Sequence, residues 1–214
     1  MDQPLKNKFD SIIFDLDGTL WDSTQNVVYA WQAAINEVDF LDVVMTQEKV
    51  RSITGLAYNV IFDMLFPELD PIQRNKVMEL CAKHEMSFLH KNGGILYPNL
   101  ENTLIYLVQK YRLFIVSNCQ NGYIELFLEF SKFGKYFIGH QCYGTKGLPK
   151  ADNIKDIVID YNLQAPVYIG DTLGDYNSAA KAGVPFIFAN YGFGIVESGQ
   201  IANISSLTEL CELL

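Results

Sequence analysis

The feature that most constrains the fold is a continuous apolar run near the start of the chain, residues 11–16, which stops at Asp17-Gly18-Thr19. Apolar residues that follow one another without alternation are typical of a strand covered on both faces, as in the centre of a parallel sheet. A glycine directly after such a run favours a turn. The run therefore predicts a central parallel strand that ends in a turn at Gly18.

The next part of the chain, residues 22–91, contains no convincing strand and has helical periodicity. Apolar residues such as Val27, Val28 and Trp31 recur at the spacing of one helix face. Two further helical stretches are expected at residues 47–65 and 71–90, with prolines at their boundaries. Because these helices stand between the first strand and the next, they predict an inserted all-α subdomain.

Helices and strands alternate in the remaining chain. The pattern predicts strands at 112–116, 136–138, 167–169 and 186–188, with helices between them and a closing helix near Leu207. Such alternation is typical of an α/β, doubly wound parallel-sheet (Rossmann-like) core. We expect residues 1–20 and 92–214 to form this core and residues 21–91 to form the inserted all-α subdomain.

Charge and composition exclude several classes of function. The chain has 16 Lys and Arg against 25 Asp and Glu, a net charge of −9, which disfavours nucleic acid as a partner. No apolar run reaches the roughly 18 residues of a membrane-spanning helix, and residues 1–6 lack the apolar segment of a secretory signal. We expect a cytoplasmic protein that does not enter a membrane.

The cysteines and histidines are far apart in the sequence, which disfavours a zinc, redox or histidine-based site. They are Cys81, Cys119, Cys142, Cys211, His84, His90 and His140.

Polar residues follow the predicted strands, where ligands of open α/β sheets bind. The first strand leads into Asp15-Leu16-Asp17-Gly18-Thr19, the strand at 112–116 leads into Ser117-Asn118, and the strand at 167–169 leads into the segment from Gly170 to Asp175. Lys150 opens the helix between the last two strands. Each segment alone fits an ordinary turn or cap. All of them at one edge of a sheet predict a functional site.

The four segments resemble the motifs of the haloacid dehalogenase superfamily of phosphohydrolases. Asp15-Leu16-Asp17-Gly18-Thr19 matches the DxDGT signature, and the continuation Leu20-Trp21-Asp22-Ser23 resembles the phosphoglycolate phosphatase-like branch. Ser117, Lys150 and the GDxxxD pattern from Gly170 to Asp175 match the second, third and fourth motifs. The inserted helices look like the cap domain of that branch. The resemblance spans nearly the whole chain and implies a hydrolase of phosphoric monoesters.

The resemblance also implies roles for the aspartates. Asp15 is expected to be the nucleophile that forms an aspartyl phosphate, and Asp17 the general acid and base. Asp15, Asp17 through its backbone carbonyl, and Asp171 are expected to bind the metal. An all-oxygen set of ligands favours Mg²⁺. If the first strand continues to Asp17, the side chains of Asp15 and Asp17 point to the same side.

The other motif residues are expected to hold the phosphate or the residues around it. Ser117 would donate its hydroxyl to a phosphoryl oxygen, and Lys150 would place a positive charge beside the phosphate and Asp15. Asp175 would orient a metal-bound water or hold Lys150. Further contacts to the phosphate or its surroundings are expected from backbone amides near Asp17 and from Gly18, Thr19 and Asn118.

Some alternatives stay open at this point. Lys146 competes with Lys150, because family members often carry Lys-Pro at the third motif and neither lysine is followed by proline. A phosphomutase of the β-phosphoglucomutase type uses the same core, and a non-enzymatic receiver module also combines Asp, Ser or Thr, and Lys. The second aspartate disfavours a dehalogenase. The expected partner is a small phosphorylated metabolite, and the sequence indicates neither its identity nor the oligomeric state.

Overall fold

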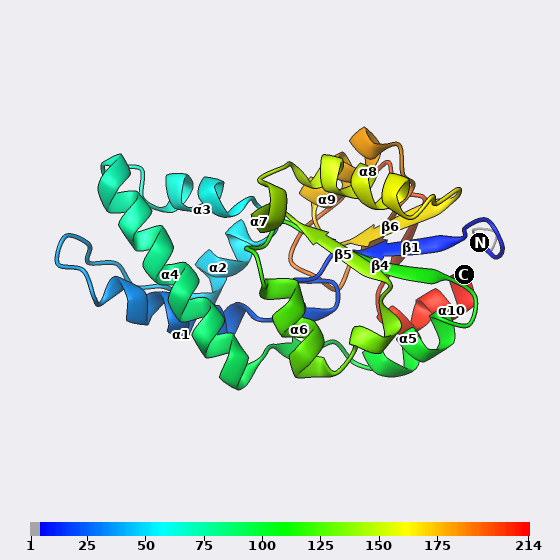
Figure 1. The fold of residues 1–214 in the computed structure, drawn as a ribbon, viewed down its shortest axis with the longest axis horizontal. Coiled ribbons are helices and arrows are strands. Elements are labelled where there is room, and N and C mark those ends of the chain that lie inside the picture. Colours follow the sequence, from blue (N-terminus) through cyan, green and yellow to red (C-terminus); the bar gives the residue numbers. More distant parts are fainter. Residues whose placement is uncertain (1–4) are drawn as a thin grey trace.

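A six-stranded parallel sheet forms the centre of the computed structural model, which describes residues 5–214 (Figure 1). The strand order is β5-β4-β1-β6-β7-β8, and each neighbouring pair is parallel. The expected polar start of the chain falls partly on residues 1–4, which lie outside the described residues. The strands are β1 (Ser11–Phe14), β4 (Arg112–Ser117), β5 (Gly139–Cys142), β6 (Pro166–Gly170), β7 (Phe186–Ala189) and β8 (Ala202–Ile204).

Helices cover both faces of this sheet, as the continuous apolar run of β1 requires. Ile12 and Phe14 belong to one hydrophobic cluster, whereas Ile13 belongs to a second cluster on the opposite face. Figure 1 shows α8 and α9 on one face and α5, α6 and α10 on the other. The doubly wound core is therefore confirmed. These helices are α5 (Leu100–Leu107), α6 (Tyr123–Ser131), α8 (Lys150–Asp160), α9 (Leu173–Ala182) and α10 (Leu210–Leu213), with the short α7 (Tyr143–Lys146) before α8 and two 3₁₀ turns, Gly134–Tyr136 and Leu207–Glu209.

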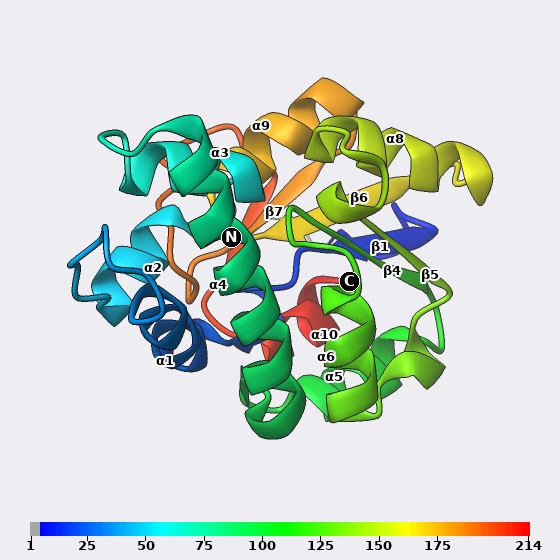
Figure 2. The same cartoon turned by 60° about the vertical axis from the view of Figure 1, so that its left-hand side comes forward.

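Four helices gather beyond one end of the sheet, and no strand lies among them (Figures 1 and 2). They are α1 (Thr24–Ile35), α2 (Gln47–Ile53), α3 (Tyr58–Leu65) and α4 (Pro71–Asn92). Asp70 caps α4 by accepting hydrogen bonds from the amides of Ile72 and Gln73. The inserted all-α segment predicted from the helical periodicity is thus present.

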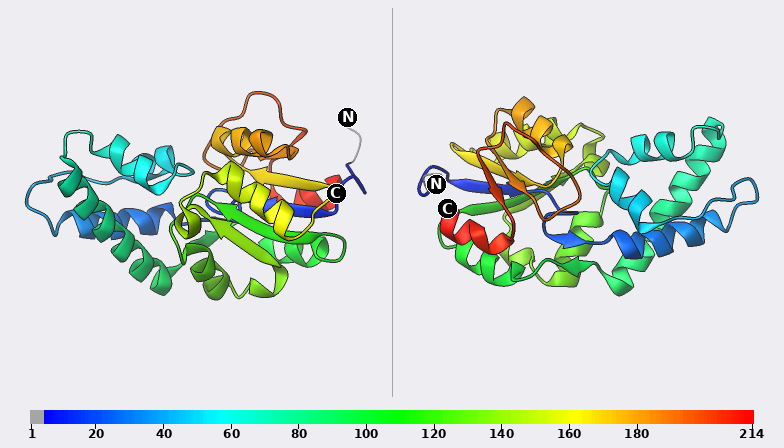
Figure 3. Two further views of the ribbon diagram at one scale, coloured as in Figure 1. Left: turned by 45° about the horizontal axis from the view of Figure 1, so that its top comes forward. Right: turned by 180° about the vertical axis from the view of Figure 1, so that it is seen from behind.

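Two chain crossings join the helical segment to the sheet. β2 (Trp21–Asp22) and β3 (Ile95–Leu96) pair antiparallel, so the outgoing and returning chain lie side by side (Figure 3). Trp21 is fully buried here and packs against Tyr123 and Phe127 of α6. The indole therefore fastens the crossing to the core.

Two predicted elements are wrong in detail. The helix expected at 47–65 breaks between α2 and α3, where Thr54 is extended and Gly55 has a φ of +91°. The strand expected at 136–138 begins at Gly139 instead, after a 3₁₀ turn. β5 is an edge strand with half-exposed residues, so its apolar signal is weak. The edge strand β8 was not predicted for the same reason.

A search of residues 5–214 for a helix long and apolar enough to cross a bilayer finds none.

Candidate active site

Three neighbouring strands bring the predicted site residues together. β1 lies between β4 and β6 in the sheet, and all three run parallel. Asp15 directly follows β1, Ser117 ends β4, and Asp171 directly follows β6. Because parallel strands end at the same edge, these three residues lie at one point of the molecule.

Lys150 is the lysine that reaches this point. Its Nζ lies 2.7 Å from Asp15 Oδ1 and 2.6 Å from Asp175 Oδ1, and the side chain is 2% exposed. Lys146 instead pairs with Asp156 at 2.6 Å on the surface. Lys150 is the first residue of α8, whereas Lys146 is the last residue of the short α7, so the two side chains start from different helices. Of the two candidates, Lys150 is the one beside Asp15.

The buried cluster perturbs the pKa values of its members. Burial, followed by the charge of Asp175, raises the pKa of Asp15 to about 7, although Lys150 opposes the shift. Burial would lower the pKa of Lys150, but the charges of Asp15 and Asp175 raise it well above its usual value. Burial and the charges of Asp175 and Asp15 raise the pKa of Asp171. The cluster therefore needs more positive charge than one ammonium supplies.

The donor atoms of the cluster fit a divalent cation. Asp15, Asp171 and Asp175 each offer a carboxylate oxygen, and these oxygens lie within 4.8 Å of one another. With Lys150, three carboxylates leave two uncompensated negative charges, which one divalent cation neutralises. Carboxylate oxygens without sulfur or imidazole nitrogen suit Mg²⁺.

A turn far along the chain holds Asp171 in place. The backbone amide of Phe193 donates to Asp171 Oδ2 at 2.7 Å, and Thr19 Oγ1 donates to Oδ1 at 3.3 Å. A Cβ atom on Gly192 or on Gly18 would collide with the Asp171 side chain, and Gly18 also has a φ of +87°. The segment around Phe193 thus positions Asp171, a role that its sequence alone did not suggest.

The backbone amides of the turn after β1 donate hydrogen bonds to carbonyl groups of the same turn. The amide of Gly18 donates to the carbonyl of Trp21, and the amide of Thr19 donates to the carbonyl of Leu16. The amide of Gly18 is therefore used within the turn, and Gly18 lies against the side chain of Asp171. Thr19 acts on Asp171 through its hydroxyl instead.

Asp17 is not part of the carboxylate cluster of Asp15, Asp171 and Asp175. Strand β1 ends at Phe14, so Asp15 and Asp17 do not share an extended segment and their carboxylates have different partners. The side-chain donors of Trp21, Ser23 and Tyr123 lie 2.9, 2.7 and 2.9 Å from Asp17 Oδ1. The condition for strand alternation, that β1 continues to Asp17, is therefore not met, although Asp15 and Asp17 line the same pocket. Burial raises the pKa of Asp17 to about 6, against the effect of these hydrogen bonds.

Ser117 and Asn118, at the end of β4, make different contacts. Ser117 is buried and lines the pocket together with Asp15 and Asp17. Asn118 Nδ2 donates to the carbonyl of Gly55 at 2.7 Å, which ties the core to the loop between α2 and α3. Its amide therefore fastens the helical segment over the pocket.

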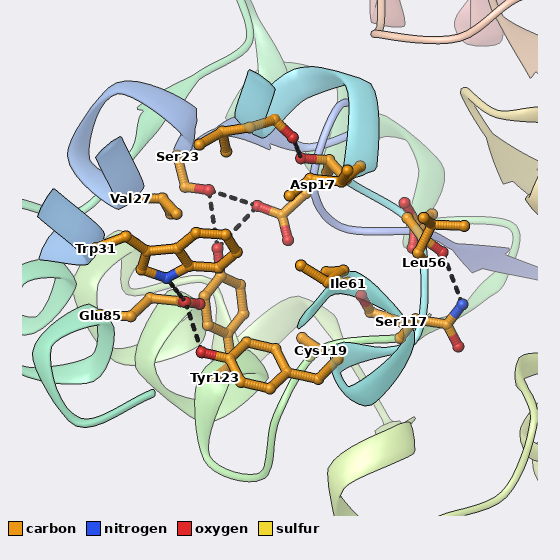
Figure 4. Close-up of a pocket in the computed structure, with 17 residues that line it drawn as sticks. Asp17, Ser23, Val27, Trp31, Leu56, Ile61, Glu85, Ser117, Cys119 and Tyr123 are labelled. Atoms are coloured by element: carbon orange, nitrogen blue, oxygen red, sulfur yellow. Dashed lines mark hydrogen bonds between the residues drawn. The ribbon is translucent and has the colours of Figure 1, made fainter. Parts of the chain in front are cut away.

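The pocket lies between the sheet edge and the inserted helices (Figure 4). One wall carries Asp15, Asp17 and Ser117. The other wall consists of residues of α1 to α4 and the α2–α3 loop, most of them apolar: Val27, Trp31, Val50, Ile53, Thr54, Gly55, Leu56, Tyr58, Ile61 and Glu85. Figure 4 shows Glu85 and Trp31 to one side of Asp17. Thr54 and Gly55 line the pocket, whereas Arg51 pairs with Asp22 at 2.6 Å.

Glu85 is a pocket residue that the sequence interpretation missed. It is 5% exposed and follows Val77 and Cys81 at intervals of four along the buried face of α4. A carboxylate within such an apolar stripe is the signal that could have revealed it. Trp31 Nε1 donates to Glu85 Oε2 at 2.6 Å, and the Tyr58 hydroxyl donates to the same oxygen at 3.2 Å.

Burial shifts the titration of Glu85 strongly. It raises the pKa of this carboxyl to about 7, and the hydrogen bond from Trp31 only partly offsets the shift. The groups that bond to Glu85 are neutral, and within residues 5–214 no lysine or arginine pairs with it as Lys150 pairs with Asp15.

Comparison with known proteins gives consistent results at the level of sequence. A family model described as haloacid dehalogenase-like hydrolase matches residues 12–189. The phosphoglycolate phosphatase of Vibrio parahaemolyticus is 26% identical over 219 residues, which covers 95% of either chain. The phosphoglycolate phosphatase of Escherichia coli is 25% identical over 221 residues, which covers 90% of this chain and 86% of the other.

Comparison with solved structures supports the same fold. A haloacid dehalogenase-like family hydrolase from Streptococcus pneumoniae superimposes with a TM-score of 0.81 at 21% identity. The match covers 96% of this chain and 98% of that chain. At this identity the likeness shows a shared fold.

Proposed function

The chain belongs to the haloacid dehalogenase-like hydrolase family and is a phosphatase, and we propose that it hydrolyses a small phosphomonoester with Mg²⁺ through an aspartyl phosphate. The resemblance and the enzyme class expected from the sequence are thereby confirmed. The observation that carries the finer proposal is the buried contact of Asp15 with Lys150 beside Asp171. We place the catalytic core at residues 5–20 and 92–214, the cap at 21–91 and the enzyme in the cytoplasm; residues 1–4 of the expected core lie outside the described residues.

In the proposed reaction, Asp15 attacks the phosphorus atom. Lys150 occupies Asp15 Oδ1, which leaves Oδ2 for the attack. The Ser117 hydroxyl and the Lys150 ammonium hold phosphoryl oxygens and stabilise their charge in the transition state. Asp175 keeps Lys150 in position through the contact at 2.6 Å.

Asp17 would transfer the protons. The hydrogen bonds from Trp21, Ser23 and Tyr123 all end on Oδ1, so Oδ2 is available for the leaving oxygen. A carboxyl with a pKa near 6 can donate a proton to the leaving alkoxide and later accept one from the attacking water.

Bound Mg²⁺, held by Asp15, Asp171 and the backbone carbonyl of Asp17, would neutralise the phosphate charge that the core wall otherwise repels. Asp175 shares the cluster, and its side chain already accepts from Thr172 and Lys150. We therefore assign Asp175 to holding Lys150.

The pocket composition argues against the phosphomutase alternative. A mutase must bind a second phosphate between cap and core, which calls for cationic side chains. Among the described residues that line the pocket there is no lysine, arginine or histidine. Hydrolysis to an alcohol and inorganic phosphate needs no such second anion site. Membership in a hydrolase family likewise disfavours a receiver module.

The test is phosphate release from a panel of small phosphomonoesters by the wild type and by Asp15→Asn. We expect release with Mg²⁺, none with a chelator, and background release by the variant with its fold retained. An isomerised product without free phosphate would instead support the mutase. Activity of Asp15→Asn close to that of the wild type would contradict the nucleophile assignment.

A further inference from the structure

Glu85 stands out because nothing in the proposed chemistry uses it. It belongs to the cap helix α4, yet it lines the same pocket as Asp15 and Asp17. A phosphatase pocket that receives an anionic substrate gains nothing from another buried carboxylate, which disfavours phosphate binding by repulsion. The residue therefore needs an explanation other than phosphate binding.

Structural stability does not explain Glu85 either. The side chain is 5% exposed, and its partners Trp31 and Tyr58 are neutral donors. Removing a carboxylate from water without a cation destabilises a folded protein, and an apolar residue in the stripe of Val77 and Leu89 would pack there without that penalty. A buried, uncompensated carboxylate that faces a cavity is typical of a ligand-binding group.

The hydrogen bonds to Glu85 leave one oxygen for a ligand. Both bonds end on Oε2, and within residues 5–214 no further hydrogen bond reaches this carboxylate, although the Gln120 side chain lies near enough to lower its pKa. Trp31 and Tyr58 also fix the orientation of the carboxylate, because their rings pack edge to face with centroids 6.3 Å apart. The group is thus held in one orientation with an open acceptor.

The rest of the cap wall offers little to an anion. Its other side chains are largely apolar, such as Val50, Ile53 and Leu56, and lysine and arginine are absent from the described pocket lining. A leaving group that ends in a carboxylate would face Glu85 without a compensating cation. A leaving group that ends in a hydrogen-bond donor would satisfy the open oxygen.

We propose that Glu85 selects the leaving group of the substrate by accepting a hydrogen bond from an ammonium or hydroxyl group and by repelling a carboxylate. This inference rests on the proposed phosphatase function and makes its substrate class narrower. It separates this chain from the relatives named phosphoglycolate phosphatase, whose substrate by name carries a carboxylate.

The test uses four esters that share the reacting phosphate and its first carbon: 2-aminoethyl phosphate, 2-hydroxyethyl phosphate, ethyl phosphate and phosphoglycolate. At pH 8 with Mg²⁺, we expect kcat/KM for the aminoethyl or the hydroxyethyl ester to exceed that for phosphoglycolate by about tenfold or more. The ratio between the aminoethyl and hydroxyethyl esters tells which donor the carboxylate prefers.

Glu85→Gln removes the charge and keeps the shape. We expect the preference over phosphoglycolate to fall to within about threefold, mainly through a gain with phosphoglycolate. Glu79→Gln is the matched control, because Glu79 lies exposed on the same helix. That control should keep the wild-type ratios.

The outcomes separate the two proposals. Hydrolysis that favours phosphoglycolate in the wild type, or ratios that Glu85→Gln leaves unchanged, would overturn the role of Glu85 alone. Failure of the wild type to release phosphate from any ester, including those of the wider panel, would overturn the phosphatase proposal and this inference with it. The wild-type series decides the matter even if Glu85→Gln does not fold.

Discussion

The buried carboxylates of the site fall into two groups that differ in their neighbours, which we call the metal side (Asp15, Asp171 and Asp175) and the leaving-group side (Asp17 and Glu85). On the metal side, Asp15 and Asp175 contact the ammonium of Lys150, and these two carboxylates together with Asp171 suit a divalent cation. On the leaving-group side, Asp17 and Glu85 receive hydrogen bonds only from neutral groups.

This difference in neighbouring charge matches the different roles that we propose for the two groups of carboxylates. Carboxylates that must stay ionised, as a nucleophile and metal ligands do, are placed beside positive charge. Burial raises the pKa on both sides, to about 7 for Asp15 and Glu85 and to about 6 for Asp17. The charge of Lys150 opposes the shift of Asp15, whereas only hydrogen bonds from neutral groups oppose the shifts of Asp17 and Glu85. The next three experiments address this contrast, beginning with the largest expected effect.

Asp17→Asn removes the proton-transfer group from the leaving-group side. We expect kcat to fall about 10²–10⁴-fold, because a general acid and base contributes that much. The metal side should be intact, so Mg²⁺ should still bind in a calorimetric titration. Asp160→Asn, an exposed change on α8, is the control. A kcat within a few-fold of the wild type would remove Asp17 from the mechanism.

Lys150→Met removes the positive charge from the metal side. The buried carboxylates of Asp15 and Asp175 then lose their cation, which should lower the free energy of unfolding by about 3–5 kcal/mol without Mg²⁺. Urea unfolding measures this change, and Mg²⁺ should restore part of the loss. Lys146→Met is the matched control, because its pair with Asp156 is on the surface, where solvent screens the two charges. Equal effects of the two substitutions would contradict the assignment of Lys150.

Glu85→Gln tests the leaving-group side through stability. The pKa of Glu85 is raised from 4.5 to about 7 on folding, so the folded state binds its proton more tightly than the unfolded state. The wild type therefore loses stability as the pH rises through this interval, whereas the variant does not titrate here. The difference in unfolding free energy should shift in favour of Glu85→Gln by about 3 kcal/mol between pH 4.5 and 8.

The measurement for Glu85 is urea unfolding at several pH values between these limits. Glu79→Gln should show a difference from the wild type that is small and independent of pH, because Glu79 is exposed. A similarly flat profile for Glu85→Gln would mean that Glu85 is ionised in the folded protein without penalty.

The sequence could predict that Asp15, Ser117 and Asp171 lie together, because all three are at the ends of strands. The continuous apolar runs of β1, β4 and β6 located the strand ends, and the rule that parallel strands end together placed Asp15, Ser117 and Asp171 at one edge. The sequence did not decide between Lys150 and Lys146, since the two lysines are close together in the chain and both precede the body of the same helix. Three-dimensional structure separates them by burial.

The leaving-group side was harder to predict for two physical reasons. The orientation of Asp17 depends on where β1 ends, and element boundaries carry little sequence signal. Glu85 lies in the middle of a long helix, and its position in the pocket depends on how α4 packs against α1 and α3. Only the interruption of an apolar stripe by a carboxylate marks it in the sequence.

The most direct test of the reaction proposed for this site is detection of the covalent intermediate. Wild-type protein mixed with a good substrate and Mg²⁺ and quenched in acid during turnover should carry one phosphoryl group, which peptide mass spectrometry should place on Asp15. The same experiment with a chelator should give unmodified protein. Turnover that leaves Asp15 unmodified at every quench time, or a phosphoryl group on another residue, would contradict the mechanism.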